Sequence, residues 1–166
     1  MNNTLSRRLA AINLLVLDVD GVLTDGRLLY GAQGEIGKSF NVKDGFGMRR
    51  LMQNGVSVAV ISARRSEGAL VRFTELGLTH IYLGCRDKQK QIRQLQKSLA
   101  VERDATAVVG DDVPDLDMMA EAGLAIAVAD AAREIQDIAD WTTDQAGGQG
   151  AVREVCDAII AARQRA

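Results

Sequence analysis

Residues 14–22, LLVLDVDGV, place four consecutive apolar residues before two aspartates and a glycine. A continuously apolar run of this kind is typical of a strand that is buried on both faces of a parallel sheet. Asp18 lies between Leu17 and Val19, so we expect its carboxylate to be partly buried. A buried carboxylate is costly unless a cation or metal ion pairs with it. The stretch therefore predicts a first strand and a charged site at its end.

Similar apolar runs recur along the chain, with helical patterns between them. The runs are Val56–Ile61, Ile81–Leu83, Ala105–Val109, Leu124–Val128 and Trp141–Thr143. In the intervening segments apolar residues recur at helical spacing, as they do at Ile92, Leu95 and Leu99. This alternation favours an α/β fold with a Rossmann-like, doubly wound parallel sheet.

One stretch departs from the alternation. Residues 28–40, LLYGAQGEIGKSF, place Gly31-Ala32-Gln33-Gly34 between two short β-prone segments. This pattern predicts a β-hairpin with a four-residue loop. We expect a hairpin insertion after the first strand, at about residues 26–41, followed by a helix over about 45–54. The insertion is too small to be a domain of its own, so a single domain over residues 1–166 is predicted.

Composition excludes several classes of protein. Twenty basic and 22 acidic residues give a formal net charge of −2, without a positive excess to attract nucleic acid or an anionic membrane. The apolar runs are far shorter than the roughly 20 residues of a membrane-spanning helix. The N-terminus lacks a signal-peptide pattern, and Cys85 and Cys156 lack CxxC spacing, so no zinc site or disulfide framework is expected. We therefore expect a cytoplasmic protein that binds neither nucleic acid nor a membrane.

Polar residues follow four of the predicted strands. Because ligands in open α/β sheets bind beyond the carboxyl ends of the strands, we expect these side chains to share one rim. Each also has a simpler interpretation, since an Asp after a strand often caps backbone amides and Ser62 alone would be a helix cap. Lys88 is unusual, because a cation at a helix start opposes the macrodipole unless an anion binds there. The residues are Asp18 and Asp20, Ser62 and Arg64, Lys88, and Asp111, Asp112 and Asp115.

This ordered set resembles the haloacid dehalogenase superfamily of phosphotransferases. The features that carry the resemblance are the Asp18–Val22 motif, a hydroxyl at Ser62, a lysine at Lys88 and a Gly-Asp-Asp motif from Gly110. Response-regulator receiver domains combine similar residues around magnesium, but their lysine follows the other site residues in the chain. Here Lys88 precedes Asp111, and this order argues against a receiver domain.

Longer motifs are similar to those of the small, capless 3-deoxy-D-manno-octulosonate 8-phosphate phosphatases. They are DVDGVLTDGRLLYGAQGEIGKSFNVKDGFGMRRL at 18–51, GDDVPDLDMM at 110–119, AVADA at 127–131 and AGGQGAVREVCDAII at 146–160. One departure is Ala63, where the family commonly has glycine. The resemblance covers nearly the whole chain and implies a fold of the haloacid dehalogenase type without a cap domain.

The resemblance also implies a reaction and a set of roles. It implies magnesium-dependent hydrolysis of the sugar acid's 8-phosphate in lipopolysaccharide biosynthesis, by a homotetramer whose hairpins cover neighbouring sites. Asp18 is then the nucleophile that forms an aspartyl-phosphate, and Asp20 is the general acid and base. Ser62 and Lys88 contact the phosphoryl group. Magnesium is held by Asp18, the backbone carbonyl of Asp20 and Asp111, while Asp112 and Asp115 fix Lys88 or metal-bound water.

An acidic sugar phosphate also carries a carboxylate, which calls for an arginine. Arg64 is one candidate and Arg153 is another, and the resemblance implies that the segment with Gly148 and Gly150 closes over the substrate. Two alternatives remain open. One is a phosphatase of a nine-carbon ulosonic acid 9-phosphate, although relatives of that kind tend to have Glu at the position of Arg64. The other is a non-catalytic assembly module, against which the presence of both Asp18 and Asp20 argues.

Overall fold

The computed structural model describes residues 3–165, and a six-stranded parallel sheet forms its centre. The strand order is β5-β4-β1-β6-β7-β8, and every neighbouring pair is parallel. The sequence therefore correctly predicts the doubly wound α/β sheet and its six strands. Their bounds are β1 Leu14–Leu17, β4 Ser57–Ser62, β5 His80–Leu83, β6 Thr106–Gly110, β7 Leu124–Ala127 and β8 Trp141–Thr142.

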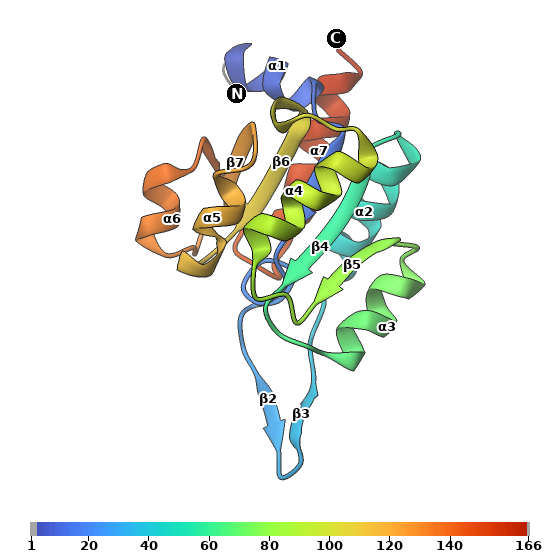
Figure 1. The fold of residues 1–166 in the computed structure, drawn as a ribbon, viewed down its shortest axis with the longest axis vertical. Helices are drawn as coiled ribbons and strands as arrows, with labels where there is room; N and C mark the ends of the chain where they lie inside the picture. Colours follow the sequence, from blue (N-terminus) through green and yellow to red (C-terminus); the bar gives the residue numbers. More distant parts are fainter. Residues whose placement is uncertain (1–2, 166) are drawn as a thin grey trace.

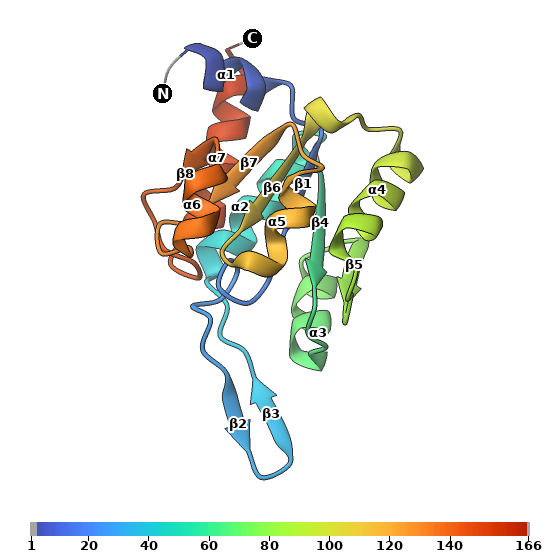
Figure 2. The same ribbon diagram turned by 60° about the vertical axis from the view of Figure 1, so that its left-hand side comes forward.

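Helices cover both faces of the sheet, as the two views show (Figures 1 and 2). On one face α1 (Asn3–Ala10) and α2 (Val42–Gln53) pack against α7 (Ala151–Arg163). On the other face α4 (Lys88–Leu99) packs against α5 (Leu116–Met119). The remaining helices are α3 (Glu67–Glu75) and α6 (Arg133–Ile138), with short 3-10 turns at Arg103–Ala105 and Val113–Asp115.

Two helices, α1 and α6, lie outside the elements that the sequence predicts. Leu5 and Leu9 have helical spacing in α1, but a pattern of only eight residues is too short to be distinctive in sequence. Packing stabilises this helix instead, because Leu9 is fully buried. Among residues 3–165, none of the helices combines the length and apolar character needed to cross a membrane.

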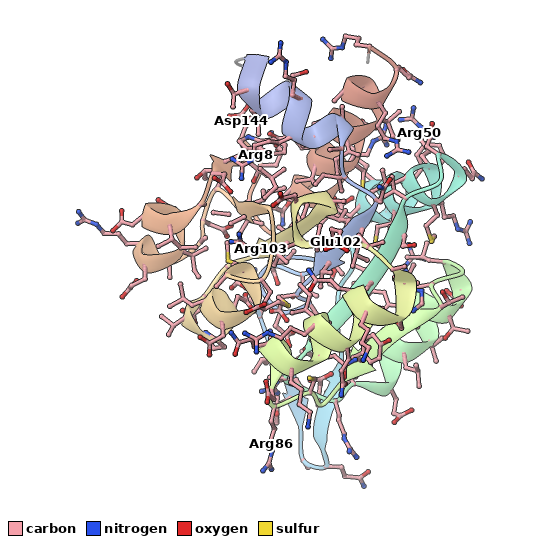
Figure 3. All side chains as sticks on the ribbon, turned by 45° about the horizontal axis from the view of Figure 1, so that its top comes forward. Arg8, Arg50, Arg86, Glu102, Arg103 and Asp144 are labelled. Carbon is pink, nitrogen blue, oxygen red and sulfur yellow. The ribbon has the colours of Figure 1, made fainter. Side chains whose placement is uncertain are left out.

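An ion pair ties α1 to the sheet. Arg8 donates two hydrogen bonds to Asp140, at 2.8 and 2.7 Å, and Asp140 also accepts a bond of 2.9 Å from the backbone amide of Ala125 in β7. Arg8 lies at the end of the molecule opposite Arg86, which belongs to the loop at the carboxyl end of β5 (Figure 3). This contact therefore supports the fold away from the carboxyl ends of the strands.

The predicted hairpin is present and projects beyond the carboxyl ends of the sheet strands (Figure 1). It consists of β2 (Leu29–Gly31) and β3 (Gly34–Gly37), which are antiparallel. The prediction of a four-residue loop is wrong, because Gly31 pairs with Gly34 and only two residues connect the strands. Phe40 ends the segment that the sequence assigns to the hairpin. Its ring lies edge-on against Phe73 with centroids 5.4 Å apart, so it packs against the core and does not join the exposed hairpin surface.

Candidate active site

The carboxyl ends of three strands and the start of α4 meet at one cavity of about 260 Å³. Asp18 follows β1 directly, Ser62 is the last residue of β4, Asp111 follows β6 and Lys88 begins α4. The cavity lining includes every residue that the sequence suggests for catalysis or metal binding, together with Arg64. The lining residues are Asp18, Asp20, Ser62, Ala63, Arg64, Lys88, Asp111, Asp112, Pro114 and Asp115.

Lys88 lies between two carboxylates at the floor of this cavity. Its ammonium donates to Asp18 Oδ1 and to Asp115 Oδ1, each at 2.7 Å, and only 6% of its side chain is exposed. Burial alone would lower the pKa of Lys88, but the charges and hydrogen bonds of the two carboxylates raise it. The lysine therefore remains cationic. A cation at the start of a helix is unfavourable unless anions lie beside it, and here the carboxylates of Asp18 and Asp115 are those anions.

Asp115 is held on both sides. One oxygen accepts from Lys88, and the other accepts from the backbone amide of Asp111 at 3.1 Å. Gly110 leaves room for this side chain, since a Cβ at Gly110 would lie 2.8 Å from the Cβ of Asp115. Asp112 points elsewhere and caps the turn at Val113 with a bond of 2.8 Å. The geometry thus places Asp115, rather than Asp112, against Lys88.

Ser62 is buried at the end of β4, and its hydroxyl accepts a bond of 3.3 Å from the amide of Arg64. Helix α3 is capped by a different residue, Ser66, whose hydroxyl accepts from the amide of Ala69. The helix-cap interpretation of Ser62 is therefore wrong. Its hydroxyl faces the cavity, where it can donate a hydrogen bond to a bound oxygen atom.

The cavity has a surplus of negative charge. Carboxylate oxygens of Asp18, Asp111 and Asp115 lie within 4.8 Å of one another. Burial and the neighbouring Asp115 raise the pKa of Asp18 to about 6, against the opposing effect of Lys88. Burial and the charges of Asp115 and Asp18 raise the pKa of Asp111 to about 8. A divalent cation would relieve this repulsion, and hard oxygen ligands of this kind fit magnesium.

Gly21 allows the loop after β1 to pass close to Asp111. Its φ is +92°, and a Cβ at this position would lie 2.0 Å from Asp111 Oδ2. Glycine is therefore required at position 21 both by the positive φ and by the closeness of the Asp111 side chain. The next turn is held by Thr24, whose hydroxyl accepts from the amides of Gly21 and Gly26 at 3.3 and 3.2 Å. These bonds fix the loop that directly follows Asp20.

The glycine segment before α7 packs against the same loop. Gly148 donates its amide to the carbonyl of Val22 at 2.9 Å, and a Cβ at Gly147 would lie 1.6 Å from the carbonyl oxygen of Gly21. Neither Gly148 nor Gly150 lines the cavity within this chain. Their observed contacts support the loop that carries Asp18 and Asp20.

Arg153 also lies outside the cavity lining. Its backbone amide donates to the buried Asp44 at 2.7 Å, and its guanidinium donates to Asp157 at 2.6 Å. The same guanidinium lies 5.3 Å from the centre of the Phe46 ring. The structure therefore brings Arg64 to the cavity but does not bring Arg153 there within one chain.

Sequence reasoning missed two hairpin residues at the cavity edge. The ammonium of Lys38 contacts Asp20 Oδ1, and Glu35 lies 3.6 Å from Arg64. Arg64 also donates a bond of 2.8 Å to the hydroxyl of Tyr30. No local pattern identifies these partners, because their positions depend on how the hairpin leaves the sheet.

Comparisons with known proteins agree with this geometry. A family model described as haloacid dehalogenase-like hydrolase matches residues 85–155. The chain is 43% identical to the 3-deoxy-D-manno-octulosonate 8-phosphate phosphatase of Yersinia pestis, over 96% of this chain and 85% of the relative. It is 44% identical to the phosphatase of the same name from Escherichia coli K12, over 92% and 81%.

Solved structures of phosphatases with the same name have the same fold as this chain. The Yersinia pestis enzyme superposes with a TM-score of 0.96 at 42% identity, covering 99% of this chain and 89% of that one. The Moraxella catarrhalis phosphatase, in complex with magnesium, phosphate and KDO, has a TM-score of 0.95 at 38% identity, covering 99% and 95%.

Proposed function

Because the chain belongs to the family of 3-deoxy-D-manno-octulosonate 8-phosphate phosphatases, we propose that it hydrolyses this sugar phosphate in a magnesium-dependent reaction. The products are the free eight-carbon sugar acid and phosphate, in lipopolysaccharide biosynthesis. The observation that carries the proposal is the buried contact of Lys88 with Asp18 and Asp115 in a cavity that also holds Asp111.

Asp18 is the nucleophile in this proposal. Its carboxylate lies at the cavity floor, and with a pKa of about 6 it is mainly ionised at neutral pH. Attack on phosphorus forms an aspartyl-phosphate and breaks the bond to the sugar oxygen. Lys88 balances the charge of Asp18 and of the phosphoryl oxygens, which would otherwise repel each other. The hydroxyl of Ser62 donates to a phosphoryl oxygen.

Asp20 transfers the protons in both steps. It protonates the departing sugar oxygen, then takes a proton from the water that hydrolyses the aspartyl-phosphate. Asp20 lies two residues beyond Asp18, and both side chains line the same cavity. Among the described residues no hydrogen bond engages Asp20 Oδ2, which leaves that oxygen for the transfer.

The donor set fits magnesium. Asp18, Asp111 and the backbone carbonyl of Asp20 would hold the ion, while Asp115 is occupied with Lys88 and the Asp111 amide. When bound, the ion supplies positive charge to the phosphoryl oxygens. Asp112 lies at the cavity edge, where it can accept a hydrogen bond from metal-bound water.

Arg64 binds the carboxylate of the sugar acid in this proposal. Its Nε is buried without a hydrogen-bond partner among residues 3–165, at the edge of the cavity. Gly148, Gly150 and Arg153 stay candidates for closing the site, and since they lie outside this chain's own cavity, they would do so from a second subunit.

A panel of sugar phosphates tests the proposed function. We expect phosphate release from 3-deoxy-D-manno-octulosonate 8-phosphate with magnesium, and a much lower kcat/KM with a nine-carbon ulosonic acid 9-phosphate. Preference for the nine-carbon substrate would overturn the substrate assignment. An absence of phosphate release from every compound would favour the non-catalytic assembly module.

We also propose that the six-stranded sheet and hairpin form one phosphatase domain that assembles into a homotetramer. The exposed fractions of Leu28, Leu29, Tyr30 and Ile36 are 44, 60, 58 and 66%, and these residues form an apolar surface on the hairpin. An isolated two-stranded hairpin is marginally stable in water, so burial against other copies would stabilise it. Such pairing would cover each active site with a neighbouring hairpin.

Polar substitution of this surface tests the assembly. The double variant Leu29→Ser, Ile36→Ser should have a smaller mass in solution and a lower turnover. Ile138→Ser is the matched control, since Ile138 is 50% exposed on α6, away from the hairpin. An unchanged mass and turnover for the double variant would contradict the shared-site model.

The proposed location is the cytoplasm. A sugar phosphate is strongly charged and does not cross a bilayer unaided, so the phosphatase must share a compartment with the reaction that forms its substrate. Fractionation of cells that express the tagged chain would test this, and recovery in the membrane or periplasmic fraction would contradict it.

A further inference from the structure

The base of the hairpin contributes a buried ammonium to the cavity edge. Lys38 directly follows β3, and although the hairpin tip is exposed, only 2% of the Lys38 side chain is. Its ammonium contacts Asp20 Oδ1 and lies 3.5 Å from Glu35 Oε2. A buried ammonium is costly unless carboxylates compensate it, and here two do so.

A second cation completes the group. Arg64 Nε lies 3.7 Å from Asp20 Oδ2, and Arg64 Nη2 lies 3.6 Å from Glu35 Oε2. The group therefore contains two cations and two anions, with Asp20 between Lys38 and Arg64. A hydrogen bond from Ser66 and the charges of both cations lower the pKa of Glu35, which keeps it ionised beside Lys38.

The two oxygens of Asp20 have different surroundings. Oδ1 is engaged by Lys38, whereas Oδ2 is buried and has no hydrogen-bond partner among residues 3–165. A charge-assisted bond to one oxygen of a carboxylate fixes the rotamer and thereby the position of the other oxygen. Oδ2 faces Arg64 Nε at 3.7 Å without a hydrogen bond, and Asp20 lines the cavity, so Oδ2 is the oxygen left to exchange a proton there.

We propose that Lys38 is a positioning residue, which holds Asp20 so that its Oδ2 faces the departing sugar oxygen. The inference rests on the proposed role of Asp20 as general acid and base. Lys38 itself does not touch the substrate. Because both residues belong to one chain, the hairpin base orients its own general acid, while the hairpin tip is left to contact other copies.

This role predicts a dependence on the leaving group. A sugar oxygen is a poor leaving group and needs a well-placed proton donor, whereas 4-nitrophenolate departs without one. Misplacement of Asp20 should therefore slow cleavage of the sugar phosphate and spare cleavage of 4-nitrophenyl phosphate. A purely structural disturbance of the cavity would slow both.

The test measures the first chemical step alone, in single-turnover reactions with enzyme in excess and magnesium present. For Lys38→Met we expect the rate on the sugar phosphate to fall by about 10²-fold, the cost of a misplaced catalytic group. Release of 4-nitrophenol should stay near the wild-type rate. Lys38→Arg, which retains a cation that can reach Asp20, should recover part of the loss.

Lys43→Met is the matched control, because Lys43 is exposed on the first turn of the neighbouring α2. It should change neither rate. An equal loss on both substrates, or no loss on either, in Lys38→Met would overturn the positioning role.

A parallel measurement on Asp20→Asn separates this inference from the proposed function. If Asp20→Asn shows the leaving-group dependence and Lys38→Met does not, only the role of Lys38 fails. If Asp20→Asn itself lacks the dependence, the proposed role of Asp20 fails, and the inference falls with it. Should the octulosonate ester prove not to be a substrate, any alkyl phosphate that the enzyme accepts serves in the same comparison.

Discussion

Removing the charge of Lys88 should destabilise the protein as well as inactivate it. In Lys88→Met, the carboxylates of Asp18 and Asp115 lose an ammonium that lies 2.7 Å from each of them. Their side chains are only 9% and 2% exposed, so water cannot replace the lost partner. Breaking a buried ion pair by removal of one partner costs about 3–5 kcal/mol. For a chain of this length, 3 kcal/mol corresponds to a decrease in Tm of about 6–12 °C.

Thermal unfolding without divalent ions measures the effect. Magnesium should raise the Tm of Lys88→Met more than that of the wild type, because the added cation offsets the same repulsion. Adding Asp115→Asn should recover part of the lost stability, with a coupling of at least about 0.5 kcal/mol. Lys90→Met, an exposed charge in the same helical turn, is the control. If Lys88→Met has the wild-type Tm, the ion pairs of Lys88 with Asp18 and Asp115 do not stabilise the fold, and the prediction is refuted.

Three further outcomes are expected. Asp18→Asn should keep the wild-type circular dichroism spectrum and release no phosphate, because the amide is nearly isosteric but cannot attack phosphorus; measurable turnover would exclude Asp18 as nucleophile. Chelation should abolish phosphate release and magnesium should restore it, whereas calcium, with more ligands at longer distances, should not; activity that resists chelation would contradict the metal site. Burial alone would raise the pKa of Asp140, but hydrogen bonds from Arg8 and the Ala125 amide lower it. Asp140→Asn should therefore lower the free energy of unfolding by its full amount at neutral pH and by less below about pH 4, where the wild-type carboxylate is protonated. A destabilisation that grows in acid would contradict this prediction.

The sheet could be predicted from sequence because its signal is local. Buried parallel strands are continuously apolar, and β1, β6 and β7 are fully buried along their lengths. The missed helix α1 has only eight residues, which is too short for its apolar spacing to be decisive. Its stability also depends on the burial of Leu9 and on the bond from Arg8 to Asp140, a residue 132 positions away. The hairpin loop was expected to be too long because Gly31 and Gly34 were both assigned to the turn, whereas they form the last pair of the ladder.

The centre of the site could also be predicted, since strand ends define it. Once Asp18, Ser62 and Asp111 are placed after parallel strands, the topology brings them to one edge. The start of α4 adds Lys88 to that edge for the same reason. Residues in irregular segments follow no such rule. The glycine segment around Gly148 was expected to contact substrate, whereas within this chain it packs against the loop after β1.

The contact of Lys38 with Asp20 shows the physical limit of sequence reasoning here. The two residues are 18 positions apart, and the segment between them leaves the sheet and returns. In sequence Lys38 is an ordinary charged residue at the end of a short strand, which would normally be solvated. Its burial follows from the direction in which the hairpin leaves the sheet, and that direction depends on the turn at Gly21 and on the packing of Phe40 against the core. The charge of Lys38 must also be compensated for the side chain to be buried, and Asp20 and Glu35 supply the opposite charge. The fold of the hairpin thus brings Lys38 to Asp20, and the opposite charges of the two residues hold them together.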